Sequence, residues 1–192
     1  MQAQDVLDFW FLPPHDPGYG KPRVEWFRKD PAFDAQIRER FGSLIAQALA
    51  GGLREWEENG PQGALARILV LDQFTRNAYR EAPESFAGDT LALAAAQALV
   101  DSGADRQLEP FQRAFVYMPY EHAEDARMQQ CAVDLFARLA DEHHGFSEML
   151  DYAHRHRGVI ARFGRFPHRN PILGRASTAD ELQYLGQPGA GF

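Results

Sequence analysis

Arginine and histidine side chains are concentrated in one segment near the C-terminal end of this 192-residue chain. From Tyr152 to Ala179 the sequence holds six arginines, three histidines and no acidic residue, although the whole chain has a formal net charge of -7. Within that segment, residues 163–175 contain two prolines, which fix φ, and two glycines, which allow positive φ. We therefore expect an ordered, positively charged loop of a kind that suits an anionic ligand.

The side chains of this loop supply the hydrogen-bond donors for such a ligand. Arg165, Arg169 and Arg175 carry planar guanidinium groups, which bind carboxylates and phosphates through paired hydrogen bonds. His168 and Asn170 add two more polar side chains beside them. The alternative is structural, because the same arginines could pair with carboxylates of the protein and hold the last helices together. The sequence leaves both interpretations open.

A histidine on the helix before the loop is a candidate for acid–base chemistry. His156 shares an apolar helical stripe with Ala153 and Ile160, so it is predicted to face the interior. A lone histidine on such a stripe is more often a hydrogen-bonded core residue, but this one stands two turns before the loop. If the protein is an enzyme, His156 or His168 is the predicted general acid/base.

A second polar group lies on a largely apolar helix in the first half of the chain. Asp72, Arg76 and Arg80 recur every fourth residue on one face, and Gln73 and Asn77 lie beside them. A polar stripe on a central helix costs stability unless its groups are satisfied or solvated. It either lines a cleft, with Arg76, Asn77 and Gln73 as ligand-binding residues, or forms an ordinary ion-paired face.

A third group combines acidic residues and a histidine at the start of a predicted helix. Glu121 shares a helical face with Glu124 or Asp125, and His122 lies three residues before Asp125. Acidic residues also favour helix N-termini through the helix dipole, so the pattern has a structural explanation as well. A metal site needs ligands that converge from at least two segments, so we predict no metal and no cofactor. Glu121 or Asp72 is the candidate partner for a catalytic histidine, and His122 a candidate ligand-binding residue.

The amino-acid composition limits the kinds of partner and the cellular location that the protein is expected to have. The isoelectric point near 5.5 argues against general nucleic-acid binding. No apolar run approaches the ~20 residues that a membrane span needs, and the N-terminus lacks the early positive charge of a signal peptide. With Cys131 as its single cysteine, the chain cannot form an internal disulfide. We predict a soluble cytoplasmic protein with no nucleic-acid or membrane partner.

The elements that position these residues all follow helical periodicity. No stretch alternates with period two for long enough to predict a strand. Short links between about eight helices favour an all-α fold, an antiparallel helical-hairpin stack, in one domain over residues 1–192 with a loose tail at 186–192. The predicted helices cover residues 3–12, 31–50, 61–79, 90–100, 110–117, 124–143 and 147–163, with a final helical turn that begins at a capping box, Thr178 to Glu181.

Several short motifs along the chain form a pattern that resembles a bacterial family known as domain of unknown function 924. The motifs are Asp8-Phe9-Trp10-Phe11, Trp26-Phe27, Leu71-Asp72-Gln73-Phe74-Thr75-Arg76-Asn77, Pro119-Tyr120-Glu121-His122, and Phe163 through Arg175 followed by Ser177-Thr178. Ala123 departs from the small polar residue typical of the family. The resemblance implies an all-helical fold similar to tetratricopeptide-like stacks, and it implies no activity.

Two functions from different classes therefore compete. The first is a binding module that holds an anionic small molecule or a peptide carboxylate in a cleft near the 163–175 loop. The second is a hydrolase-like enzyme that acts on a phosphorylated or carboxylated metabolite with a histidine as general acid/base. Because no complete catalytic constellation is visible in the sequence, the binding module is the favoured hypothesis.

Overall fold

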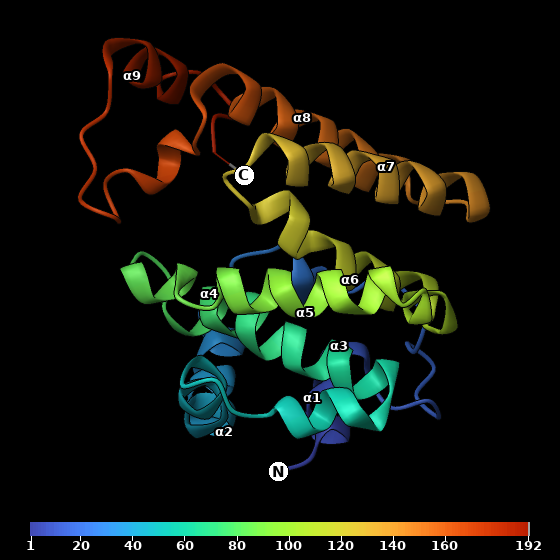
Figure 1. Cartoon of the computed structure of the whole chain (residues 1–192). Helices are drawn as coiled ribbons and strands as arrows, with labels where there is room; N and C mark the ends of the chain where they lie inside the picture. The colour runs from blue at the N-terminus through green and yellow to red at the C-terminus, as the bar shows by residue number, and fades with distance from the viewer. Residues whose placement is uncertain (192) are drawn as a thin grey trace. The chain divides into compact units, whose positions relative to one another are not determined.

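The computed structural model describes residues 1–191, and within them every regular element is helical (Figure 1). This confirms the predicted all-α fold of about eight helices. The α-helices are α1 (Ala3–Phe11), α2 (Pro31–Leu49), α3 (Pro61–Leu69), α4 (Thr75–Ala78), α5 (Asp89–Asp101), α6 (Pro110–His122), α7 (Ala126–Glu142), α8 (Ser147–Phe163) and α9 (Ala179–Leu185).

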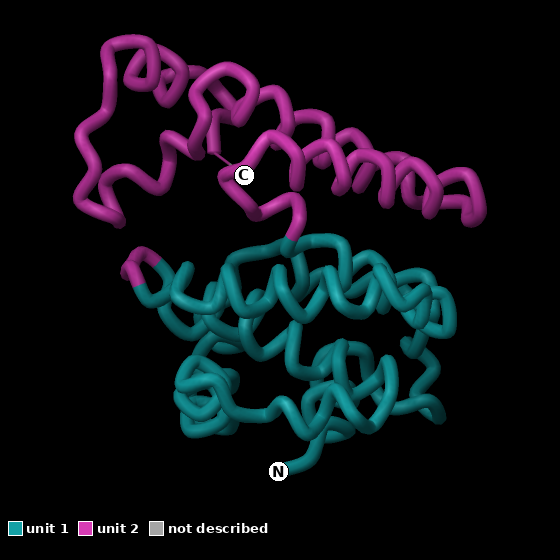
Figure 2. Tube along the Cα trace, in the orientation of Figure 1, with its two compact units in different colours: residues 1–80, 84–119 teal, residues 81–83, 120–192 magenta. Residues whose placement is uncertain are grey.

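The chain folds into two compact units (Figure 2). The N-terminal unit comprises residues 1–80 and 84–119, and the C-terminal unit comprises residues 81–83 and the chain from residue 120 onward. The boundary in sequence therefore falls inside α6, after Pro119. This division does not test whether either part folds alone, so the single domain over residues 1–192 stays a prediction.

An aromatic core organises the N-terminal unit. Trp10 of α1 is fully buried, and its ring lies 5.7 Å from that of Phe74 and 5.4 Å from that of Phe115. Aromatic pairs at these centroid distances add to the stabilisation that comes from the area they bury. α1 and α5 both pack against α3, which is buried along most of its length. The first predicted helix, over residues 3–12, thus contributes buried apolar side chains to this core.

The predicted helix over residues 61–79 contains a feature that the sequence did not predict. Between α3 and α4 the chain forms a π-helical turn, Val70–Phe74, before the helix ends at Ala78. π-helical turns are rare in proteins, and those that do occur are often found at functional sites. Here the turn contains Asp72, which is completely buried.

Proline did not end α6 where the sequence suggested. The predicted helix stopped at Tyr117, before Pro119, but α6 continues through this proline to His122. Proline disfavours a helix interior because it lacks an N–H and its ring crowds the preceding turn. Beyond the proline, the side chain of Gln129 donates to the carbonyl of Glu121 at 2.6 Å and to that of Ala123 at 2.8 Å. These bonds satisfy carbonyls at the end of the extended helix.

α7 and α8 pack along each other as a helical pair in the C-terminal unit (Figure 1). α7 begins at Ala126 rather than near Glu124, because Asp125 is its N-cap and accepts a hydrogen bond from the amide of Met128 at 2.9 Å. α8 buries Val159 and Ile160 against Phe166, and Phe163 packs beside them. This small core fixes the start of the loop that follows α8.

α9 begins as its capping box predicted. Thr178 accepts from the amide of Glu181, and the Glu181 carboxylate accepts from the amide of Thr178. Residues 186–189 form turns and a bend, and the amide of Ala190 is bonded to the carbonyl of Gln187. The last residue of the predicted loose tail, at position 192, lies outside the described residues.

Candidate functional site

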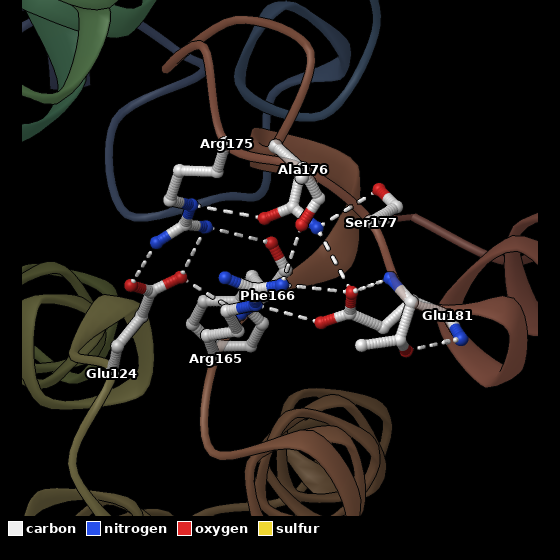
Figure 3. Close-up of polar contacts among 9 residues, drawn as sticks. Glu124, Arg165, Phe166, Arg175, Ala176, Ser177 and Glu181 are labelled. Atoms are coloured by element: carbon white, nitrogen blue, oxygen red, sulfur yellow. Dashed lines mark hydrogen bonds and ion pairs between the residues drawn. The ribbon is translucent and has the colours of Figure 1, made fainter.

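Two carboxylates hold the positively charged loop, and we call these contacts the carboxylate lock: Glu181 with Arg165, and Glu124 with Arg175. Glu181, from α9, accepts hydrogen bonds from Nε of Arg165 at 2.7 Å and from its Nη2 at 2.9 Å (Figure 3). It also accepts from Nδ2 of Asn170 at 3.3 Å and from the amide of Thr178 at 2.7 Å. One buried carboxylate therefore ties the loop to the helix that follows it.

The second half of the lock joins the loop to the segment between α6 and α7. Glu124 accepts from Nη1 of Arg175 at 2.7 Å and from Nη2 at 2.9 Å, in a bidentate pair (Figure 3). The same carboxylate accepts from the amide of Phe166 at 2.7 Å. Arg175 also donates from Nε to Oδ1 of Asn170 at 2.9 Å and from Nη2 to the carbonyl of Phe166 at 3.1 Å. Both ends of the loop are thus held by side chains distant in sequence.

The lock shifts the acid–base properties of its members. Hydrogen bonds from Arg165 and from the amide of Thr178 lower the pKa of Glu181 to about 2. Burial raises the pKa of Glu124, but the hydrogen bonds from Arg175 and from the amide of Phe166 outweigh it, so this pKa lies below its ordinary value. Both groups are therefore carboxylates throughout the physiological range.

These contacts give Arg165, Arg175 and Asn170 a structural role. Each of the three was predicted to bind a ligand, and each has partners inside the loop or in the lock. Their predicted ligand contacts are not tested by this structure. The sequence also allowed a structural role, in which loop arginines pair with carboxylates of the protein. Arg165 and Arg175 form such pairs, with Glu181 and Glu124.

Basic side chains gather around the ring of Phe166, which is fully buried. The rings of His156 and His168 lie 5.5 Å and 5.7 Å from it, and the guanidinium of Arg169 lies 4.7 Å from its centroid. The ring of His122 lies 6.4 Å from that of His156. We call His122, His156, His168 and Arg169 the histidine–arginine cluster.

Three separate elements position this cluster. His122 is the last residue of α6, His156 lies in the middle of α8, and His168 and Arg169 belong to a 3-10 turn, Pro167–Arg169. Arg169 is buried and donates from Nη2 to the carbonyl of His122 at 2.9 Å, which joins the turn to the end of α6. His122 and His168 are partly exposed, so the cluster is accessible to a solute.

His156 is buried, as the apolar stripe predicted, and it faces a carboxylate. Its Nδ1 lies 2.9 Å from Oε1 of Glu121 and 2.9 Å from the carbonyl of Tyr152. Both neighbours are acceptors, so Nδ1 carries a proton. This is the arrangement in which a carboxylate orients an imidazole for acid–base chemistry. Glu121 and His156 were both predicted for these roles.

The surroundings of His168 disfavour its protonated form. Burial lowers the pKa of His168, and the charge of Arg169 and the neighbouring rings of His156 and His122 lower it further, to about 4. Glu124 acts in the opposite direction, but it does not compensate. At pH 7 the His168 ring is therefore neutral. Within residues 1–191 no group of three or more His, Cys, Asp or Glu side chains is placed to hold a metal ion.

The polar stripe in the first half of the chain, from Asp72 to Arg80, belongs to the N-terminal unit. Its side chains contact one another and acidic residues of that unit. Arg76 binds Asp89 through Nη1 at 2.8 Å and Nη2 at 3.1 Å, and its Nη1 lies 3.1 Å from Oδ1 of Asp72. Burial lowers the pKa of Arg76, but the charges of Asp72 and Asp89 raise it above its ordinary value. Gln73 donates to Asp72 Oδ2 at 2.5 Å.

The other end of the stripe contacts α2. Asn77 donates to Oδ1 of Asp34 at 2.8 Å, and Arg80 binds both oxygens of the same carboxylate, at 2.5 Å and 3.0 Å. Asp34 and Asn77 are buried. The predicted ligand contacts of Arg76, Asn77 and Gln73 remain untested, and their side chains connect helices of the N-terminal unit.

Sequence reasoning missed the residues that complete these networks. Glu181 was recognised only as part of a capping box, and Glu124 only as one of several acidic residues at a helix start. No sequence pattern indicated Asp34 and Asp89, which are the partners of Arg80 and Arg76. Phe166 was visible only as an apolar residue of the loop, although it is the ring around which the histidine–arginine cluster gathers.

The fold and site define an all-α protein whose charged C-terminal loop is closed by internal carboxylates. A sequence model of the family described as "Bacterial protein of unknown function (DUF924)" matches residues 6–189, so the chain belongs to that family, as its motifs suggested. It is similar to the solved structure of a protein of unknown function from Agrobacterium tumefaciens, with 39% identity, a TM-score of 0.82 and 96% of each chain covered. The comparison with curated proteins finds no match.

Proposed function

We propose that the protein binds a small anionic molecule, one with a phosphate or carboxylate group, at the histidine–arginine cluster. The observation that carries this proposal is that two imidazoles and one guanidinium, those of His156, His168 and Arg169, lie around the ring of Phe166, and that a third imidazole, that of His122, lies 6.4 Å from His156. Burial and the charge of Arg169 disfavour a proton on His168, and an anion placed among these groups would act in the opposite direction. Partial exposure of His122 and His168 gives the anion access.

The carboxylate lock supports the same assignment indirectly. Arg165 and Arg175 are matched by Glu181 and Glu124, so a ligand that recruited them would have to break an existing ion pair. Arg169 instead lies over Phe166 and joins the turn to the end of α6. In this proposal the lock is the support that keeps the turn in shape, and Arg169 is the main anion-binding arginine.

Binding is tested by isothermal titration calorimetry and thermal shift with inorganic phosphate and a set of phosphorylated and carboxylated metabolites. A ligand that binds only the native state raises the melting temperature by mass action. We expect Arg169→Ala to lose the response, and Arg162→Ala, which alters an exposed arginine of α8, to retain it. Equal responses in the two variants, with both folded, would contradict the proposal.

A second candidate function, a hydrolase-like enzyme, is favoured by one contact. Glu121 lies within hydrogen-bonding distance of His156, so a histidine general acid/base would already have its orienting carboxylate. In such a reaction His156 would take a proton from water as the water attacks a phosphate or carboxylate ester, and it would return that proton to the alcohol oxygen as the ester bond breaks. The substrate would bind by its anionic group at the same cluster.

The enzyme hypothesis predicts hydrolysis of a simple anionic ester such as p-nitrophenyl phosphate or mono-p-nitrophenyl succinate, which has a free carboxylate. General acid/base catalysis contributes about 10² to 10⁴ in rate, so His156→Gln should lose that factor while the exposed His154→Gln does not. Glu121→Gln should reduce kcat and change the pH profile. If wild-type protein hydrolyses neither ester, or the His156 variant is as active as wild type, the enzyme hypothesis is wrong.

Location and architecture complete the proposal. No helix in the described part of the chain is long and apolar enough to cross a membrane. The single cysteine is compatible with a reducing compartment, so we assign the protein to the cytoplasm, with neither nucleic acid nor membrane as partner. The α7–α8 pair supports a helical-hairpin arrangement of the tetratricopeptide-like kind.

A further inference from the structure

The charges around the cluster cancel when its histidines are neutral. In the C-terminal unit, Glu121 contacts His156 of the cluster, the amide and carbonyl of Phe166 contact Glu124 and Arg175, and Arg169 belongs to the cluster itself. Glu124 and Arg175 form a bidentate pair, so these two charges offset each other. Arg169 and Glu121 then leave no net positive charge for an incoming anion. A cluster that binds an anion in this state must gain positive charge from another source.

His168 is the group placed to supply that charge. Its ring lies 5.7 Å from Phe166 on the partly exposed side of the cluster. It is faced by Arg169 on its own turn, by His156 from α8, by His122 from α6 and by Glu124 from the segment before α7. Without a ligand these surroundings disfavour a proton on His168, and an added negative charge among them reverses that balance.

Resting on the proposed function, we infer that the ligand carries a dianionic oxyanion group, of the phosphate monoester class, and that its binding places a proton on His168. A tetrahedral dianion offers more acceptor oxygens to the imidazoles and guanidinium than a carboxylate does. It also brings the larger charge, so it gains more from the protonated ring. The phosphate group thus binds more tightly as the pH falls toward its own second pKa, about 6, and carboxylates bind weakly.

Sulfate is the sharpest probe of this inference, because it stays a dianion between pH 5 and 8 and any linked proton must reside on the protein. We expect calorimetry in buffers of different ionisation enthalpy to show about one proton taken up per sulfate bound. Proton linkage of one predicts an affinity for sulfate that rises about tenfold per pH unit as the pH is lowered through this range. Acetate should bind at least about tenfold more weakly than sulfate.

Variants assign the proton to its residue. His168→Gln should bind sulfate with a pH dependence much weaker than that of wild type, whereas His154→Gln, on the exposed side of α8, should keep the full slope. Because His168→Gln could fail to fold, NMR titration of the wild-type His168 ring supplies an independent measurement. One proton taken up per sulfate over this range requires saturating sulfate to raise the pKa of that ring from about 4 to about 8 or higher.

Each failure has a distinct meaning. Sulfate binding without proton uptake, or with a slope unchanged in His168→Gln, would overturn the inference and leave the anion site standing. Equal affinity for acetate and sulfate would overturn the choice of a dianion. If neither sulfate nor phosphate binds at any pH from 5 to 8, the inference is wrong, and if acetate and the other carboxylates also fail to bind, the proposed function is wrong as well.

Discussion

The carboxylate of Glu181 receives both Nε and Nη2 of Arg165, at 2.7 Å and 2.9 Å, across sixteen residues of chain. This contact closes the loop between α8 and α9 on itself. The matching contact of Glu124 with Arg175 spans fifty-one residues and ties the same loop to the segment before α7. The turn that carries His168 and Arg169 is therefore fixed from both sides before any ligand arrives.

Loss of the Glu181 carboxylate should loosen the loop. In Glu181→Gln the ion pair with Arg165 is lost and the capping of α9 weakens, so we expect a lower melting temperature and faster tryptic cleavage after Arg169 and Arg175. Limited proteolysis with mass spectrometry measures the sites. Glu148→Gln, an exposed first-turn residue of α8, is the matched control and should leave both properties close to those of wild type.

Acid should affect the lock only at very low pH. Because the pKa of Glu181 in the folded protein is about 2, against 4.5 for the ordinary group, its stabilising contribution is complete above about pH 4.5. That contribution is lost as the pH falls toward 2. We expect tryptophan fluorescence to show a steeper loss of stability below pH 4 in wild type than in Glu181→Gln. Parallel acid-unfolding curves would show that this carboxylate is not held by Arg165 in solution.

His168 should make the protein less stable in mild acid. Its pKa falls from 6.5 in the unfolded chain to about 4 in the folded protein. Between these values the unfolded chain binds more protons, so stability falls as the pH decreases from 6.5 to 4, by an amount on the order of 2 to 3 kcal/mol. Urea denaturation at several pH values should show a shallower decline in His168→Gln than in His154→Gln. An identical decline in the two variants would contradict the prediction.

Glycine at position 63 should be required by the packing of α3. A Cβ at Gly63 would lie 1.9 Å from the carbonyl oxygen of Trp56, so Gly63→Ala must displace backbone. We expect a loss of roughly 1 to 3 kcal/mol or more. Gly158→Ala is the control, since a Cβ there meets open space in the middle of α8, and alanine should add about 0.5 to 1 kcal/mol. Thermal unfolding of both variants measures the difference.

Much of the fold could be predicted from local sequence patterns. Asp30 and Thr178 predicted the starts of α2 and α9 because side-chain caps act within three residues. The stripe through α8 predicted that His156 is buried. The extension of α6 through Pro119 was missed, because the carbonyls at its end are satisfied by Gln129, a residue of the next helix. A prediction based on local propensity has no access to that contact.

The candidate site was harder to predict for the same reason. The sequence identified the arginines of the loop but gave no way to tell Arg169 from Arg165 and Arg175. What separates them is the position of Glu124 and Glu181, and those pairs form only when three elements have folded together. The partnership of Glu121 with His156, thirty-five residues apart, was considered from the sequence only as one of several combinations.

The most direct measurement is an NMR titration of the histidine Hε1 resonances with inorganic phosphate at constant pH and ionic strength. If an anion binds at the histidine–arginine cluster, the Hε1 resonances of His122, His156 and His168 should move together along one saturable curve. Those of His154 and His15 should not move. The same titration of folded Arg169→Ala should show no saturable shift. Equal shifts of all the histidines, or no saturable shift of the three in wild-type protein, would contradict an anion site at the histidine–arginine cluster.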